Sequence, residues 1–217
     1  MKQLYEDQWL LVGQKAAGEP IQPDKSGERD ALTALQEQTG GSVYLVHRLD
    51  RPVGGIVVFA KSPWVQTELT KQFLDGRAKK TYLAVVEGQA MQEGAWTDYL
   101  KKNGRTNVSS LVPKGQAGAK QARLSFVTQA TVEVEGRWLS LLKIHLQTGR
   151  HHQIRVQCAG HGLPLYGDAK YGKKHRPGFV PLGLFSAELG FIHPKTGRQM
   201  VFSAQPVGEP FSFFCHE

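Results

Sequence analysis

The hydrophobic positions of this chain fall mostly into short apolar runs and alternating stretches, patterns that are typical of β-strands. Residues 4–5 and 9–12 predict two short strands near the N-terminus, and the uninterrupted apolar run at 56–60 predicts a buried strand. Residues 79–88 also have strand composition, with Tyr82 near their start. Strands are therefore the main elements that the sequence predicts.

Two later stretches alternate apolar and polar residues on either side of a predicted turn. The first covers residues 122–126, the second covers 142–146, and Glu135–Gly136 lies between them. This arrangement favours an antiparallel hairpin. Two further short strands are predicted at 191–192 and 200–202, which again suggests hairpin-like connections.

Three helices are predicted from their start and stop signals. Asp30 is a candidate N-cap for a helix that ends at Gly40, and the Ser62–Pro63 pair is typical of the start of a second helix. That second helix carries an apolar stripe as far as Gly76, and residues 152–160 predict a third, short helix.

The balance of these elements indicates the fold class. Because strands outnumber helices and the connections are hairpin-like, we expect an α+β fold with a mixed, largely antiparallel sheet and flanking helices. The 217 residues suit a single domain covering 1–217. Residues 101–120, rich in Gly, Ser, Lys and Asn, are expected to form a mobile excursion from it.

Composition and charge indicate the cellular compartment and the class of partner. The net charge of +8 favours a polyanionic partner, although a basic soluble protein need not have one. The only cysteines, Cys158 and Cys215, lack the spacing of a metal site or a disulfide framework. No apolar run is long enough for a signal core or a membrane span. We therefore expect a soluble cytoplasmic protein that does not associate with membranes.

One segment places a single carboxylate, Asp50, between two arginines, Arg48 and Arg51. A proline and a glycine pair follow, and then the apolar run at 56–60 begins, so Asp50 is predicted to lie on a loop that an adjacent strand fixes. Such loops commonly present reactive groups. The alternative is a loop acid that its neighbours neutralise, and for Arg-x-Asp-Arg taken alone that is the more common case.

A second segment, residues 147–157, joins the end of a strand to the start of a short helix. Backbone donors at the helix start, together with Arg150 and Arg155, predict an anion site whose ligand is either a phosphate or Asp50 itself. Three histidines, His151, His152 and His161, invite a zinc interpretation. However, adjacent residues seldom bind one metal from a helix, and no acidic or cysteine partner is near, so we expect no metal site.

Two further residues have ordinary structural interpretations. A strand tyrosine such as Tyr82 is more often a core residue with a solvated hydroxyl than a catalyst. Asp168, in the turn-rich segment 167–172, is expected to cap or brace a loop.

Taken together and in order, five segments resemble the RluA-type family of pseudouridine synthases. The likeness runs from about residue 4 to about residue 211. The pairing of His-Arg-Leu-Asp with Gly-Arg-x-His-Gln-Ile-Arg at this separation is far more specific than either motif alone. The segments are His47-Arg-Leu-Asp-Arg-Pro, Lys80-Thr-Tyr-Leu-Ala-Val-Val-Glu-Gly, Gly149-Arg-His-His-Gln-Ile-Arg, Gly167-Asp-Ala-Lys-Tyr-Gly and His193-Pro-Lys-Thr-Gly.

The resemblance implies isomerisation of chosen uridines in RNA, without metal or cofactor. It implies that Asp50 is the essential carboxylate, acting either as a nucleophile on C1′ of the target sugar or as a base at C2′. It implies that Tyr82 packs on the extruded base and assists proton removal at C5, and that Arg155 pairs with Asp50. Arg48 would enter the stack that the target base leaves.

Further substrate contacts are predicted around the two arginine-rich segments, at Arg51, Arg150, His152 and Gln153. The resemblance implies ribosomal or transfer RNA as the partner, and we expect a monomer. We also expect a stand-alone catalytic domain without the S4-type RNA-binding module of some relatives. The target RNA, the uridine position and the number of modified sites stay open.

Several positions depart from the family pattern. Residues 15–18 replace the usual Lys-Pro-x-Gly, residues 53–55 replace Thr-Ser-Gly, and His151 stands where threonine is usual. A histidine that is common before the last strands is replaced within residues 184–187. None of these positions is Asp50, Tyr82 or Arg155, so the departures weaken the transfer of substrate identity and not that of activity.

Two other functions fit parts of the sequence. A glycoside or nucleoside hydrolase would also act at an anomeric carbon, but such enzymes usually need a second catalytic carboxylate. In the motif segments, Asp168 and Glu87 look structural instead. A non-catalytic RNA-binding protein that kept the fold is the other alternative. It would not require Asp50, Tyr82 and Arg155 together.

Overall fold

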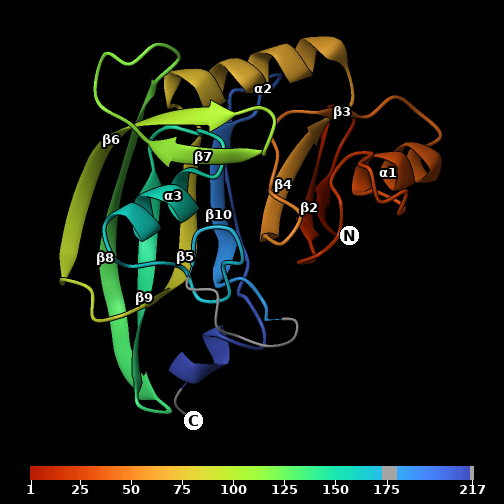
Figure 1. Ribbon diagram of the computed structural model, residues 1–217. Helices are drawn as coiled ribbons and strands as arrows, with labels where there is room; N and C mark the ends of the chain where they lie inside the picture. Colours follow the sequence, from red (N-terminus) through yellow and green to blue (C-terminus); the bar gives the residue numbers. More distant parts are fainter. Residues whose placement is uncertain (173–179, 216–217) are drawn as a thin grey trace. The chain divides into compact units, whose positions relative to one another are not determined.

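The computed structural model describes residues 1–172 and 180–215 (Figure 1). The chain divides into two compact units. The first consists of Met1–Lys80 and Phe185–Pro206, and the second of Thr81–Leu184 and Val207–Glu217. The expectation of one domain covering the whole chain stays a prediction.

The first unit is built on a mixed sheet. Its strands lie in the order β1-β2-β4-β10-β11, and β3 pairs with β4. The pair β4–β10 is parallel and the other pairs are antiparallel. The strands are β1 (Lys2–Glu6), β2 (Leu10–Lys15), β3 (Tyr44–Leu45), β4 (Gly54–Ala60), β10 (Leu184–Ile192) and β11 (Gln199–Ser203).

Both helices of this unit begin and end where the sequence predicted. In α1 (Ala31–Thr39), the Asp30 carboxylate accepts a hydrogen bond from the Thr33 N–H at 3.0 Å. In α2 (Pro63–Asp75), the Ser62 hydroxyl caps the first turn, and Gly76 ends the helix with φ 80°. Side-chain caps satisfy N–H groups that a helix start leaves without partners, and glycine adopts the left-handed stop without strain.

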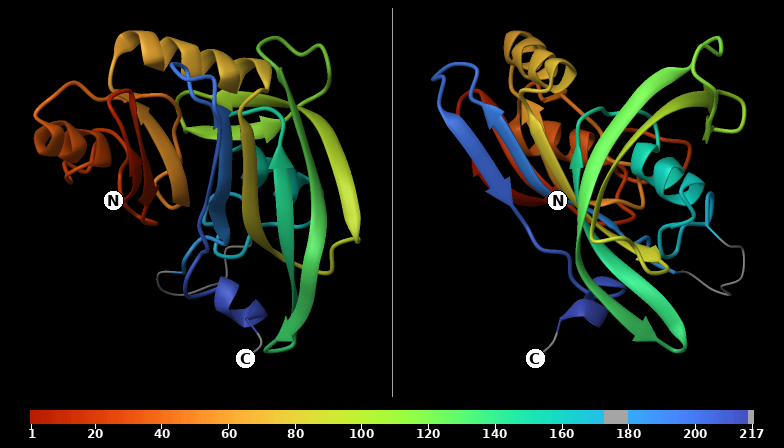
Figure 2. Two further views of the ribbon diagram at one scale, coloured as in Figure 1. Left: turned by 180° about the vertical axis from the view of Figure 1, so that it is seen from behind. Right: turned by 90° about the vertical axis from the view of Figure 1, so that its left-hand side faces the viewer.

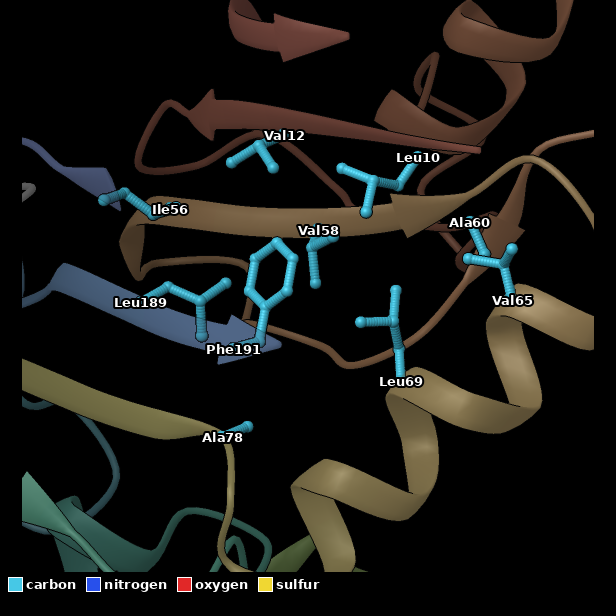
Figure 3. Close-up of a cluster of buried hydrophobic side chains, with 10 residues drawn as sticks. All are labelled: Leu10, Val12, Ile56, Val58, Ala60, Val65, Leu69, Ala78, Leu189 and Phe191. Carbon is cyan, nitrogen blue, oxygen red and sulfur yellow. The ribbon is translucent and has the colours of Figure 1, made fainter. Parts of the chain in front are cut away.

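The core of the first unit lies where α2 packs against the sheet. Val65 and Leu69 of α2 point toward side chains of β2, β4 and β10, including Val58 and Phe191 (Figure 3). Every residue of β4 is buried, which explains its uninterrupted apolar sequence. The buried amide of Gln72 exchanges two hydrogen bonds with the backbone of Ile192 and so joins α2 to the end of β10.

The second unit is an antiparallel sheet in the order β5-β9-β8-β6-β7, with the helix α3 (Gln153–Gly160) against it. The strands β6, β8 and β9 are strongly curved, and α3 lies on their concave side (Figure 2). The remaining elements are β5 (Lys79–Glu87), β6 (Glu93–Asn103), β7 (Val108–Leu111), β8 (Lys120–Val134), β9 (Arg137–Leu146) and the 3-10 helix η1 (Phe211–Phe214).

The predicted hairpin of the second unit is confirmed. Glu135 and Gly136 connect β8 to β9 with φ values of 50° and 72°. Two positive φ values in a row are what a two-residue hairpin turn of the favoured type requires. The pairing continues from Val134↔Arg137 to Leu124↔Leu146, so both strands are longer than the alternation indicated.

The segment 101–120 contains regular structure. The end of β6 pairs with β7, from Leu100↔Leu111 to Asn103↔Val108. Its composition had suggested only an excursion, whose mobility stays a prediction. The expected fold class is confirmed, since one parallel pair joins otherwise antiparallel strands flanked by helices. In the described ranges, no helix is long and apolar enough to cross a membrane.

Candidate active site

Asp50 lies in the loop that leads from β3 to β4. Its carbonyl oxygen accepts a hydrogen bond from the Val53 N–H at 2.9 Å, which closes a turn with Arg51 and Pro52 at its centre. Leu49 and Val53 on either side are 5% and 2% exposed, whereas Asp50 is only half-buried. Apolar anchors therefore fix the turn that carries Asp50, which lies on a loop next to a strand as the sequence predicted.

A buried lysine holds this turn from inside the first unit. The Lys15 ammonium donates to the carbonyl oxygens of Ala16 (2.9 Å), Glu19 (2.8 Å) and Arg51 (3.1 Å), and the residue is 1% exposed. Burial lowers the pKa of Lys15 to about 8, while the charges of Glu19 and Asp50 act in the opposite direction. The sequence did not indicate this role for Lys15, because one of the carbonyl oxygens that it binds, that of Arg51, is 36 residues away in the chain.

The arginines beside Asp50 differ in their surroundings. The Arg51 guanidinium donates to the Gly18 carbonyl oxygen at 3.0 Å and forms ion pairs with Asp24 and Glu28. It therefore ties the turn to the loop 16–28, and its predicted contact with substrate stays a prediction. Arg48 is exposed, which suits a side chain expected to enter an RNA stack.

His47 braces the approach to Asp50. Its Nε2 accepts a hydrogen bond from the Val58 N–H at 3.2 Å, just beyond the short β3–β4 ladder. Its ring stacks on Phe73, with ring centroids 4.5 Å apart. Desolvation of the ring, and then the charge of Lys80, lower the pKa of His47 to about 3. The imidazole is therefore neutral and serves as a brace, a role that the sequence did not indicate.

Tyr82 lies on β5 in the second unit, opposite Ile144 of β9. It is 8% exposed. A tyrosine largely buried in a strand is restricted in its motion, as a ring that stacks on a base requires. Its predicted contact with the target base stays a prediction.

Arg155, in the first turn of α3, forms a bidentate ion pair with Asp168. The Arg155 Nε lies 2.8 Å from Oδ2, and Nη2 lies 2.6 Å from Oδ1. Oδ1 also accepts the N–H groups of Lys170 and Tyr171, so the expectation that Asp168 braces a loop is confirmed. Burial raises the pKa of Asp168, but the hydrogen bonds and charge of Arg155 outweigh it and hold that pKa below its usual range. Asp50 belongs to the other unit, so its pairing with Arg155 stays a prediction.

The start of α3 is held by side chains that the sequence had assigned to substrate. The Gln153 Oε1 accepts hydrogen bonds from the Arg150 N–H and the Thr148 hydroxyl. His152 has a left-handed backbone conformation with φ 52°. Its Nδ1 lies 2.7 Å from the Tyr171 hydroxyl oxygen. Burial, and then the charge of Arg155, lower the pKa of His152 to about 3, so its imidazole is neutral. Arg150 is exposed. Substrate contacts of these three residues stay predictions.

The histidines near α3 make stacking and hydrogen-bonding contacts. The rings of His151 and His152 stack at 3.7 Å, and His161 stacks on Trp96 at 4.3 Å and pairs with Asp98. In the part of the chain that the structure describes, no group of three or more His, Cys, Asp or Glu side chains is placed to hold a metal ion.

Comparison with known proteins agrees with the motifs. The model of a family described as RNA pseudouridylate synthase matches residues 9–160. A tRNA pseudouridine synthase C of Vibrio parahaemolyticus is 31% identical, over 93% of this chain and 88% of that protein. Ribosomal large subunit pseudouridine synthase D of Zymomonas mobilis is 30% identical, over 93% of this chain and 68% of that protein.

A solved structure shares the fold. Human RNA pseudouridylate synthase domain containing 1 has a TM-score of 0.78 and 22% identity, over 94% of this chain and 83% of that one. With the family model covering more than half of the chain, the resemblance drawn from the motifs is confirmed. The chain therefore belongs to the RNA pseudouridylate synthase family, whose members are isomerases that act on uridines in RNA.

Proposed function

We propose that this protein converts specific uridines of a structured transfer or ribosomal RNA into pseudouridine, with Asp50 as the essential carboxylate at the target sugar. The N1–C1′ bond breaks and a C5–C1′ bond forms. A proton leaves C5 and N1 gains one, so the composition of the RNA does not change and no oxidant or reductant is needed. Asp50 acts either on C1′ as a nucleophile or at C2′ as a base.

The observation that carries this proposal is the way in which the Asp50 turn is fixed. Buried Leu49 and Val53 flank it, and Lys15 and Arg51 bond it to the preceding loop. A reacting group that is held in position before substrate binds lowers the entropic cost of reaching the transition state. A merely structural loop acid would not require a buried cation behind its turn.

Base flipping is part of the proposal. A uridine inside a stack must be extruded before its sugar can be reached, at a cost of about a few kcal/mol. Stacking of the extruded base on Tyr82 offsets roughly 1–3 kcal/mol of that cost. Arg48, which is exposed, is proposed to occupy the gap, and Arg155 is proposed to stabilise the ionised form of Asp50.

The names of the relatives guide the choice of RNA to test. Several are named tRNA pseudouridine synthase C, and this chain covers 88–89% of the length of three of them. One is named for the ribosomal large subunit. Transfer RNA is therefore the first substrate to test and large-subunit ribosomal RNA the second.

The test maps pseudouridine in cellular RNA with and without the protein, and after complementation with Asp50→Asn. We expect Asp50→Asn to fail to restore the missing modification while fold and RNA affinity persist. Asp75→Asn is the matched control, because it removes an exposed carboxylate of the same unit that pairs with Arg77. A chelator should leave wild-type activity unchanged. Substantial product from Asp50→Asn would refute the role of Asp50, and the absence of any modification by the wild type would favour an RNA-binding protein that only retains the fold.

A further inference from the structure

The positive charge of the chain is concentrated in one segment of the second unit. Residues 99–132 contain six Lys and Arg side chains and no Asp or Glu, so these 34 residues supply six of the eight net charges. The segment covers the end of β6, all of β7 and much of β8. We call its basic part, residues 99–123, the basic hairpin. Its cations are Lys101, Lys102, Arg105, Lys114, Lys120 and Arg123.

These cations are exposed, and no ion pair within the described residues neutralises them. All six are exposed, and in the described ranges none forms an ion pair with a carboxylate. The first unit differs, because five of its cations are paired with acids there: Arg29, Arg51, Lys61, Lys71 and Arg77. Like charges gathered without counter-charges repel each other, so they favour a polyanion that binds across them.

Strand pairing brings together the chain segments that carry these cations. Lys101 of β6 is opposite Ser110 of β7, and the preceding residue, Leu100, is opposite Lys120 of β8. The cations therefore lie along adjacent strands at one end of the sheet. Arg150 extends the same surface, because its Nε donates to the Gln121 carbonyl oxygen at 2.8 Å.

The basic hairpin is also attached to the segment that carries Arg155. The hydroxyl oxygen of Ser109 in the hairpin lies 2.9 Å from the His151 Nδ1. The backbone N–H of Ser109 donates to the Tyr171 hydroxyl at 2.9 Å. The Lys170 ammonium donates to the Asn107 carbonyl oxygen at 3.1 Å. These bonds join β7 and the residue before it to the segment that precedes α3 and to the turn at Asp168. β7 and α3 also contact each other and are labelled in Figure 1.

An apolar contact completes this attachment. Leu111 packs closely on Gly160, the last residue of α3. A Cβ atom at position 160 would lie 2.2 Å from the Leu111 Cδ1, so only glycine fits there without a clash. Leu111 also belongs to a small core with Leu100, Ala122 and Val156. Ser109 and Leu111 thus face α3, and by strand alternation Ser110 and its partner Lys101 face away from it.

From this arrangement we propose that the basic hairpin is a docking arm for the phosphate backbone of the substrate RNA, and that its attachment to α3 sets the register of the bound RNA relative to Arg150 and Arg155. Phosphate contacts fix the position and orientation of a nucleic acid without reading its sequence. The proposal rests on the proposed function and adds a second RNA-binding surface to it.

The test compares two variants that remove the same charge. The first, Lys101→Gln/Lys102→Gln/Arg105→Gln, alters the basic hairpin. The control, Lys2→Gln/Lys25→Gln/Arg198→Gln, removes two lysines and one arginine from exposed positions of the first unit. The probe is a fluorescein-labelled, unmodified tRNA transcript, and its dissociation constant is measured across a series of salt concentrations.

We expect the hairpin variant to bind the RNA at least about tenfold more weakly than the wild type at low salt. The slope of the logarithm of its binding constant against the logarithm of the salt concentration should decrease in magnitude by roughly 0.9 for each phosphate that the variant no longer neutralises. Its kcat at saturating RNA and its melting temperature should match the wild type, so that the effect appears in KM. The control should bind more tightly than the hairpin variant.

Equal weakening in the two variants would overturn the proposal, since net charge alone would then explain binding. Unchanged binding by the hairpin variant would overturn it as well. These outcomes are separable from failure of the proposed function, which would appear as a wild-type protein that binds RNA and forms no pseudouridine.

Discussion

Arg155 and Asp168 form a buried, bidentate ion pair in which the two side chains are 6% and 0% exposed. The pair joins the first turn of α3 to the turn that ends in Tyr171, whose ring lies 5.2 Å from the Arg155 guanidinium carbon. Two parallel charge-assisted hydrogen bonds fix the plane of the guanidinium. Arg155 is thus oriented by its own unit before it meets any group of the reaction.

The first prediction concerns this pair. Arg155→Ala should lower the free energy of unfolding by about 3–5 kcal/mol, because the Asp168 carboxylate would remain buried without its partner. Urea denaturation measures the change. The double variant Arg155→Ala/Asp168→Ala should be less destabilised than Arg155→Ala alone. An unchanged melting temperature for Arg155→Ala would mean that the arginine is solvated.

The second prediction concerns Lys15, whose pKa in the folded chain is about 8, against 10.5 for an ordinary lysine. Between these pH values the unfolded chain binds more protons than the folded chain. Burial of the ammonium therefore lowers the free energy of unfolding by its full amount below pH ~8, and this cost is relieved as the pH rises above that value. The difference in unfolding free energy between wild type and Lys15→Met should therefore shift in favour of the wild type above pH ~8, by at most about 1.4 kcal/mol per pH unit.

Chemical denaturation of both proteins at several pH values measures that difference. A difference that does not vary with pH would show that the ammonium is hydrated. Lys15→Met should also lower kcat, because the Arg51 carbonyl oxygen loses the donor that holds the Asp50 turn.

The sequence predicted those elements whose signals are local. Ser62 and Gly76 mark the ends of α2 in the sequence itself, and Glu135–Gly136 marks the β8–β9 turn. β7 was missed because its four residues owe their strand to pairing with β6, and not to their own composition.

The side chains and backbone bonds that support the Asp50 turn could not be predicted from the sequence. Lys15 acts on a carbonyl 36 residues away, and His47 on an N–H 11 residues away, and neither backbone partner leaves a trace in the sequence. The sequence offered a phosphate or Asp50 as the ligand of Arg155. Asp168, expected only to brace a loop, also supplies two oxygens to the Arg155 guanidinium, while the pairing of Arg155 with Asp50 stays a prediction.

The third prediction separates two roles of Tyr82. Tyr82→Phe keeps the ring for stacking on the extruded base and removes the hydroxyl. If the hydroxyl assists removal of the C5 proton, kcat should fall by about 10²–10⁴-fold with little change in KM. Tyr82→Leu, which also removes the aromatic face, should weaken binding as well. Single-turnover assays at saturating RNA make the comparison, and an unaltered rate for Tyr82→Phe would limit Tyr82 to stacking.

The last prediction concerns Arg48, two residues before Asp50 and exposed. Neutralising the loop would be one role for it, and lysine should then replace it tolerably. Filling the gap left by the flipped uridine is the role we favour, because Arg51 and Arg155 already supply charge and a planar guanidinium stacks where an ammonium cannot. Arg48→Lys should therefore slow modification of a structured RNA and spare a substrate whose target base is already unstacked. Rates on a stem-loop and on a matched single-stranded oligonucleotide test this. Equal slowing on both would assign Arg48 to charge neutralisation, since only the stacked substrate requires a side chain to hold the base out.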